Sequence, residues 1–219
     1  MNQAQKNKLM LCATLAMLAA TAFLLARNEE LIFRDKGELS VSRDKDDPDT
    51  IIFTWRDKVE APMAKRFDEA YREWKGEGRR ILIDLHSPGG ALAEGEQVIQ
   101  VIERMRRTHI VDTHVRARRA CYSMCVPIFL QGDERYAGAS ARFMFHEPTA
   151  YDYYTGEKVN QPQFERDMVS NRFFERYFVN SPMDAAWRDK LAKEWKGKDV
   201  FYSAQQLVDE RSNIVTVLE

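Results

Sequence analysis

Residues 119–148 read RACYSMCVPIFLQGDERYAGASARFMFHEP, and this stretch is the basis of our fold prediction. Ser123 begins an apolar run that we expect to be helical from Met124 until Gly132 stops it. Arg142–Phe145 is strand-like and leads directly into His146. A hydroxyl and an imidazole at the ends of neighbouring elements suit a nucleophile and its general base. Ser123 also has the local setting of a helix N-cap, and the residues alone leave both roles open.

Alternating strand and helix patterns surround this stretch. We predict strands at 51–55, 81–85, 110–115, 142–145 and 214–218, and helices at 61–75, 92–105, 124–132, 163–178, 183–195 and after the Ser203–Gln206 capping box. Strands that alternate with helices predict βαβ units with right-handed crossovers. The expected fold class is therefore α/β with a mainly parallel sheet, whose functional groups lie at the carboxyl ends of strands.

A glycine pair follows the second of these strands in the turn Ser87-Pro88-Gly89-Gly90. Adjacent glycines permit positive φ and expose backbone N–H groups beside a helix N-terminus, which suits an oxyanion or a phosphate. An ordinary strand-to-helix turn has the same sequence signature. Neither a Walker A nor a dinucleotide-binding pattern is present, so we expect no nucleotide cofactor.

The N-terminus has the pattern of a membrane segment. A basic flank at 1–8 precedes 18 uncharged residues, Leu9–Ala26, which can be a signal-anchor or a cleaved signal peptide. We favour the anchor because the apolar run continues through Leu25. Residues 27–50 are rich in charge and are expected to be a linker with room for an edge hairpin, and residues 51–219 form one globular domain.

Charge and cysteine content restrict the partners. Of the 33 basic residues, all but Lys6 and Lys8 follow the apolar run, and all 34 acidic residues follow it too. This balance argues against a net-basic, nucleic-acid-binding domain. Cys121 and Cys125 lie on either side of Ser123, and an exported domain makes a disulfide between them plausible, with two reduced buried thiols as the alternative. The four histidines and these cysteines do not have zinc-site spacing, so no metal is expected.

Four stretches, taken in order, resemble the Clp-protease/crotonase superfamily over roughly residues 50–217. They are ILIDLHSPGG, ACYSMCVPIFLQG, ARFMFHEP and KDVFYSAQQLVDE, and they are most similar to the Clp protease proteolytic subunit and its membrane-associated periplasmic relatives. The resemblance implies repeated β-β-α units and assigns Ser123 as nucleophile, His146 as base, Asp199 as orienting acid, and the Gly90 and Met124 amides as oxyanion donors. Composition alone does not distinguish Asp199 from three other aspartates in the same region, Asp184, Asp189 and Asp209.

Two departures from the family pattern bear on activity. Cys121 and Tyr122 stand where the family has small residues before the serine, and His86 replaces an asparagine. The resemblance implies a membrane-anchored, ATP-independent serine peptidase in the bacterial periplasm, which acts on peptides or unfolded protein segments and forms homo-oligomers. The Phe-rich segment 164–178 is either an interface between copies or part of the core. The alternatives to a peptidase are a non-catalytic binding or assembly module of the same fold, and acyl-CoA chemistry of the crotonase type.

Overall fold

A computed structural model describes residues 39–150 and 159–219 of the chain. The expected membrane segment Leu9–Ala26 and most of the expected linker lie outside the described residues. None of the described helices is both long enough and apolar enough to cross a membrane.

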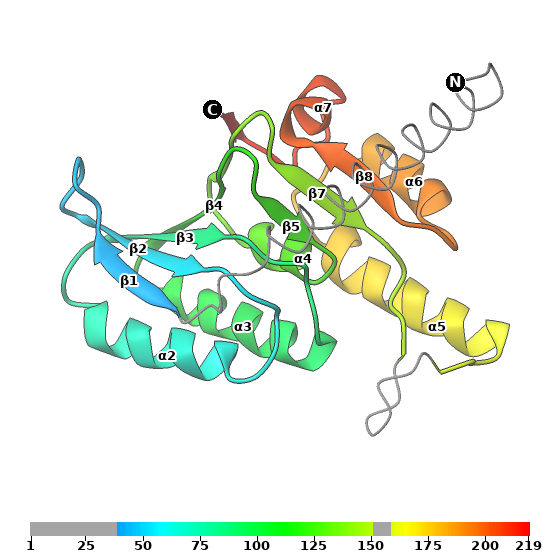
Figure 1. Cartoon of the computed structure of the whole chain (residues 1–219), viewed down its shortest axis with the longest axis horizontal. Coiled ribbons are helices and arrows are strands. Elements are labelled where there is room, and N and C mark those ends of the chain that lie inside the picture. The colour runs from blue at the N-terminus through cyan, green and yellow to red at the C-terminus, as the bar shows by residue number, and fades with distance from the viewer. Residues whose placement is uncertain (1–38, 151–158) are drawn as a thin grey trace, which may run out of the picture. The chain divides into compact units, whose positions relative to one another are not determined.

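The described residues form two β-sheets covered by helices (Figure 1). The strands are β1 (Ser40–Arg43), β2 (Thr50–Trp55), β3 (Arg80–Leu85), β4 (Ile110–Val115), β5 (Ala120–Tyr122), β6 (Arg135–Ala137), β7 (Arg142–Phe145), β8 (Val200–Ser203) and β9 (Val217–Leu218). The helices are α2 (Met63–Trp74), α3 (Leu92–Met105), α4 (Cys125–Phe129), α5 (Gln163–Phe174), the π-helical turn η1 (Glu175–Val179), α6 (Ala185–Glu194) and α7 (Ala204–Asp209).

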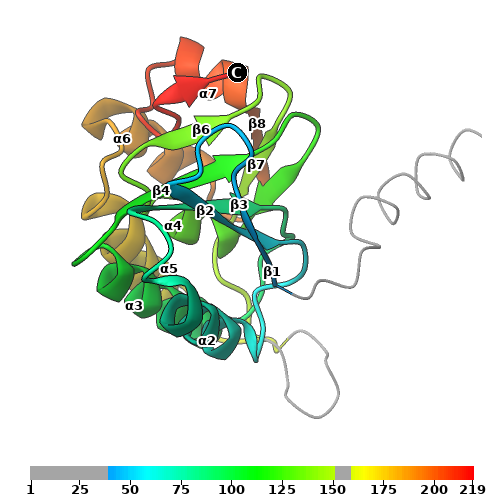
Figure 2. The same cartoon turned by 90° about the vertical axis from the view of Figure 1, so that its left-hand side faces the viewer.

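The larger sheet has the strand order β1-β2-β3-β4-β6-β9, and every neighbouring pair except β1–β2 is parallel. The prediction of a mainly parallel sheet in an α/β fold is therefore confirmed. Helices α2 and α3 lie side by side on one face of this sheet (Figure 2). Phe53, Ile83 and Val111 point into the layer between sheet and helices and are fully buried. The burial of this face explains the apolar side chains at alternate positions of β2 and β3.

The first strand confirms the edge hairpin for which the expected linker left room, and it begins the sheet at residue 40. Residues 40–43 form β1, which pairs antiparallel with β2 from Ser40 opposite Thr54 to Arg43 opposite Ile51. Leu39 and Val41 pack against the core, and alternation of small polar and apolar residues gives this short segment its strand character. Residues 40–50 therefore belong to the sheet as the edge hairpin, and the charged residues between the strands form its turn.

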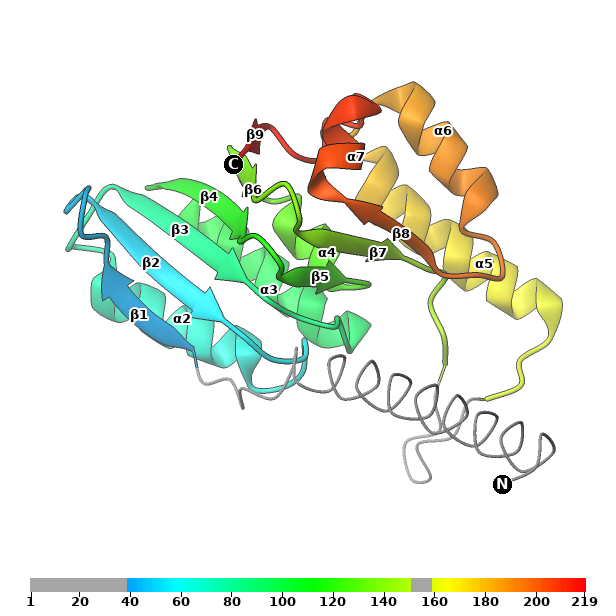
Figure 3. The ribbon, with the colours of Figure 1, turned by 45° about the horizontal axis from the view of Figure 1, so that its top comes forward.

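The smaller sheet, β5-β7-β8, carries most of the expected site (Figure 3). Strands β5 and β7 are parallel, whereas β7 and β8 are antiparallel. The sequence patterns predicted β7 but neither β5 nor β8. The three residues of β5 are too few to establish a period.

Aromatic side chains fix the carboxyl end of β7. The ring of Phe145, which is buried, lies 5.9 Å from that of Phe178, 5.7 Å from Trp187 and 6.2 Å from Tyr202. Burial, and then a hydrogen bond to the Glu194 carboxylate, raises the pKa of Tyr202 to about 12, so the phenol stays protonated and donates at 2.6 Å. This cluster anchors the residue that immediately precedes His146.

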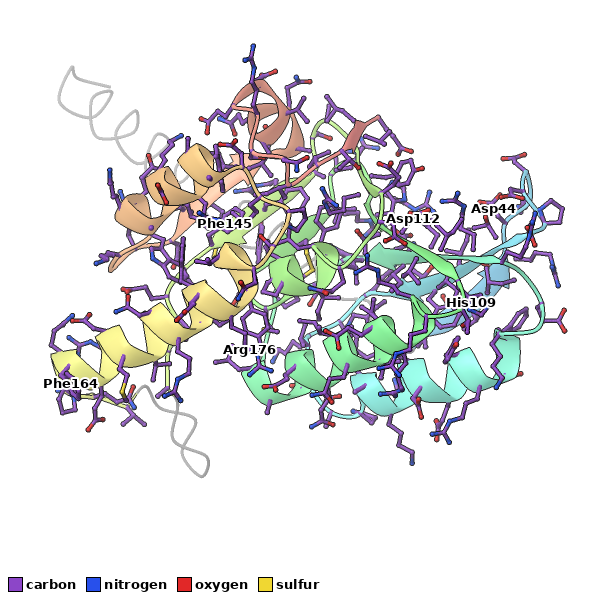
Figure 4. All side chains as sticks on the ribbon, turned by 180° about the vertical axis from the view of Figure 1, so that it is seen from behind. Asp44, His109, Asp112, Phe145, Phe164 and Arg176 are labelled. Atoms are coloured by element: carbon purple, nitrogen blue, oxygen red, sulfur yellow. A yellow bond between two sulfur atoms is a disulfide. The ribbon has the colours of Figure 1, made fainter. Side chains whose placement is uncertain are left out.

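Helix α5 is exposed along most of its length and joins the core near its end. Phe173, near its end, and Phe178, in η1, are buried in the aromatic cluster. At the opposite end Phe164 is 74% exposed and Met168 is 45% exposed (Figure 4). The core interpretation of this Phe-rich segment therefore holds for its carboxyl-terminal part, and the interface interpretation stays a prediction for the exposed part.

Candidate active site

Ser123 lies in the tight turn between β5 and α4. Its φ is 53°, in the left-handed region that non-glycine residues seldom adopt. Its N–H donates to the Met144 carbonyl at 2.9 Å, which extends the pairing of β5 with β7 by one step. The N-cap of α4 is Met124, without a side-chain capping bond, so Ser123 does not cap this helix. A strained strand-to-helix turn that presents a serine hydroxyl is the geometry of a nucleophile elbow.

A disulfide joins the two residues that flank this turn. Cys121, in β5, is bonded to Cys125, the first residue of α4, and both side chains are fully buried. The cross-link therefore closes a loop of five residues with Ser123 at its centre. Of the two states that the sequence left open, the structure contains the disulfide.

His146 follows the end of β7 and faces Ser123. The distance between its Nε2 and the Ser123 Oγ is 2.7 Å, and its side chain is 25% exposed. In the tautomer with a proton on Nδ1, Nε2 accepts the hydrogen bond from the hydroxyl. Because β5 and β7 are parallel neighbours, their carboxyl ends lie at the same edge of the sheet, which is why these two side chains meet.

Asp199 approaches the other side of the imidazole. The β7–β8 ladder ends at the pair Phe145–Val200, and one further step in this antiparallel register places His146 opposite Asp199. The Asp199 Oδ1 lies 4.0 Å from the His146 Nδ1, and the aspartate side chain is 58% exposed. This separation permits electrostatic attraction but is longer than a hydrogen bond.

The other three aspartates have different surroundings. Asp184 caps α6 by accepting from the Trp187 N–H at 2.9 Å. Asp209 accepts from the Gln205 amide at 2.8 Å, and Asp189 is exposed on α6. Of the four, Asp199 is the one that the structure brings to His146.

The glycine turn packs directly against the serine. A Cβ at Gly89, whose φ is 87°, would lie 2.6 Å from the Ser123 Cβ and 2.5 Å from the Tyr122 carbonyl oxygen, so only glycine fits there. Among the described residues, no acceptor takes a hydrogen bond from the Gly90 or Met124 N–H. The two expected oxyanion donors are therefore uncommitted in the described part of the chain.

The bulky residues before Ser123 are accommodated by the second sheet. Tyr122 is partly exposed, and its ring packs edge-on against Phe201 of β8 with ring centres 5.7 Å apart. The Cys121 side chain is turned inward, where it forms the disulfide. His86, in the asparagine position, accepts from the Ala120 N–H through Nδ1 at 3.0 Å and so attaches β5 to the glycine turn.

An open cavity of about 190 Å³ borders His146 and Asp199. Its lining includes Glu147, Arg166 and Lys198, and thus acids as well as bases. No three His, Cys, Asp or Glu side chains in residues 39–150 and 159–219 are grouped so that they could hold a metal ion. The chemistry available from the described residues is that of a hydroxyl, an imidazole, a carboxylate and backbone amides.

One contact was not anticipated from the sequence. Glu147, next to His146, accepts a hydrogen bond from the Gly197 N–H at 2.8 Å, and Gly197 belongs to the loop that carries Asp199. The only sequence signal for Glu147 is its adjacency to the histidine, because the loop that it contacts is 50 residues away.

Comparisons with known proteins identify a fold similarity. No protein-family model matches the chain, and no curated protein matches its sequence. The structure is similar to that of a ClpP1 mutant from Listeria monocytogenes, with a TM-score of 0.57 over 78% of this chain and 91% of that one. The chain has a ClpP-like fold. At 15% sequence identity the similarity concerns the fold alone, so activity has to be argued from the site.

Proposed function

We propose that this ClpP-like chain is an ATP-independent serine peptidase that hydrolyses peptides or unfolded protein segments. In this proposal Ser123 attacks the scissile carbonyl, His146 accepts and then returns the proton, and Asp199 stabilises the imidazolium. The Gly90 and Met124 amides stabilise the tetrahedral oxyanion. An acyl-enzyme forms on Ser123 as the amine leaves, and water then releases it.

The observation that carries the proposal is the 2.7 Å distance between the Ser123 Oγ and the His146 Nε2. A serine in a strained turn, in hydrogen-bond contact with an imidazole and beside two uncommitted amides, is equipped for acyl transfer. A non-catalytic module of the same fold has no need for this contact. Acyl-CoA chemistry of the crotonase type would use the oxyanion turn without requiring Ser123.

Active-site labelling tests the proposal. The purified full chain should react with a fluorophosphonate probe, and peptide mapping should place the adduct on Ser123. Ser123→Ala, which leaves a similar backbone, should abolish labelling and the cleavage of unfolded casein together. A wild-type chain that is folded but never labelled would contradict the proposal.

Export and membrane anchoring form a second part of the proposal. The apolar run Leu9–Ala26 after a basic flank supports an anchor in the bacterial inner membrane with the peptidase domain in the periplasm. The Cys121–Cys125 disulfide also favours an oxidising compartment. External protease should digest the domain in spheroplasts but not in intact cells, whereas protection in both would contradict this orientation.

We also propose that the chain forms homo-oligomers through the exposed part of α5. Phe164 and Met168 provide apolar surface there that the described residues leave uncovered. Light scattering of the detergent-solubilised chain should give a mass above that of one copy, and Phe164→Glu should lower it. An unchanged mass in Phe164→Glu would exclude this surface as the interface.

A further inference from the structure

The loop that carries Asp199 has little support of its own. It connects α6 to β8, and all of residues 196–199 are exposed. Gly197 has a φ of 70°, and a Cβ added there would meet no atom within 4 Å, so packing does not hold this turn. Its internal backbone bond, from the Lys198 N–H to the Trp195 carbonyl, is long at 3.4 Å. A loop of this kind needs attachments to fix a side chain.

Two attachments to the segment around His146 flank Asp199. On one side, Val200 pairs with Phe145 at the end of the β7–β8 ladder. On the other side, the Gly197 N–H donates to the Glu147 Oε2 at 2.8 Å. The two neighbours of His146 thus hold the loop at Gly197 and at Val200. Asp199 lies between these two attachments.

From this geometry we infer that Glu147 is a positioning residue for Asp199. The inference rests on the proposed function and deepens it. An ionised carboxylate accepts a charge-assisted hydrogen bond from a backbone N–H, which is stronger than a neutral one. Because Asp199 is already 4.0 Å from His146, an outward movement of the loop would weaken its attraction for the imidazole further. Glu147 prevents this movement.

Substitutions at Glu147 test this role through the rate of fluorophosphonate labelling of the full chain. Glu147→Ala should lower the maximal labelling rate about 3- to 10-fold and leave the half-saturating probe concentration unchanged. Glu147→Gln should stay within about twofold of wild type because its carbonyl oxygen can accept the same N–H. Glu147→Asp, one methylene shorter, should behave like the alanine variant. Glu103→Ala, on the exposed face of α3, is the matched control and should have the wild-type rate.

A double-variant cycle separates positioning from general structural damage. In an Asp199→Ala chain, Glu147→Ala should cause no further loss, because a residue that acts through Asp199 has nothing left to position. If Glu147→Ala lowers the labelling rate equally with and without Asp199, or does not lower it at all, the inference is overturned. The proposed function is left intact by either result. Absence of labelling in wild type would instead overturn the proposed function, and the inference with it.

Discussion

The His146 Nδ1 lies 4.0 Å from the Asp199 Oδ1, one step beyond the end of the β7–β8 ladder. At this separation an ion pair contributes about 1–4 kcal/mol, depending on the effective dielectric constant, and the exposure of Asp199 favours the lower part of that range. Removal of the Asp199 carboxylate should therefore slow the reaction less than removal of Ser123 or His146.

We accordingly expect Asp199→Asn to slow the labelling of Ser123 roughly 10- to 100-fold. His146→Ala should cost about 10²–10⁴-fold, because it removes the base itself. Added salt should slow the wild type toward the Asp199→Asn rate, since an exposed charge is screened. Equal rates for wild type and Asp199→Asn would show that Asp199 does not act on His146.

Arg135 is buried and is satisfied almost entirely by backbone carbonyls. It donates to Ile214 at 2.8 Å, to Gly132 at 3.0 Å and to Asn213 at 3.0 Å, which connects β6 with the segment that leads to β9. Burial lowers the pKa of Arg135 below its usual value, but the guanidinium stays charged at neutral pH. These backbone carbonyls therefore depend on the Arg135 side chain for a hydrogen-bond donor.

Arg135→Met, which keeps an unbranched apolar stem but removes every side-chain donor, should lower the free energy of unfolding by about 2–4 kcal/mol. Urea denaturation monitored by tryptophan fluorescence measures this loss. Arg107→Met, at an exposed position of similar chemistry, should change the free energy by less than about 0.5 kcal/mol. Equal midpoints for the two variants would contradict the role assigned to Arg135.

The extent to which the sequence predicted this structure depends on how local each feature is. The strand before the glycine turn and the helix after it have strong apolar patterns, and both are confirmed within a residue or two. Ser123 and His146 could be paired from the sequence because Ser123 begins the helical run and His146 follows the strand that comes next in the chain. The segment at 40–43 was placed in a linker with room for an edge hairpin, because its short apolar run among many charges did not define a strand by itself.

The position of Asp199 beside His146 could not be derived from its neighbours in the sequence. Composition does not rank Asp199 above Asp184, which lies in the same region of the chain. What separates them is the register of β8 on β7, a contact between segments more than 50 residues apart, together with the cap that Asp184 provides for α6. The contact between Glu147 and Gly197 has the same non-local origin. The membrane segment stays a prediction because it lies outside the described residues.

Glu210 makes stability depend on pH in the acid range. Burial acts to raise its pKa, but hydrogen bonds from Lys190 and Trp187, each 2.7 Å long, outweigh it and lower the pKa below 4.5. A carboxyl whose pKa is lower in the folded state than in the unfolded chain stabilises the fold above the unfolded value. That contribution is lost as the pH falls through the folded value.

We therefore expect the free energy of unfolding to fall more steeply below pH 4.5 in wild type than in Glu210→Gln. Urea titrations at several pH values between about 7 and 3 measure the two profiles. Glu103→Gln, on the exposed face of α3, should follow the wild-type profile. Parallel profiles for wild type and Glu210→Gln would show that the ion pair does not contribute.

The Cys121–Cys125 disulfide should control the geometry of Ser123. A non-glycine residue held at a φ of 53° costs about 1–3 kcal/mol, and the surrounding structure has to supply it. The cross-link fixes both ends of the turn, so its removal should let Ser123 relax toward a commoner conformation and move the hydroxyl away from His146. In the chain-entropy estimate, opening a loop this short lowers the free energy of unfolding by about 2 kcal/mol.

A double variant, Cys121→Ala with Cys125→Ala, should therefore unfold at lower urea concentration and label more slowly than wild type. Chemical reduction of wild type should reproduce the slower labelling, and the same treatment should not affect the double variant, which controls for other actions of the reductant. Mass spectrometry of the peptide that contains both cysteines establishes how far reduction has gone, which matters because both sulfurs are buried. A fully reduced chain that labels at the wild-type rate would show that the β5–β7 pairing and the Gly89 contact alone hold the serine in place.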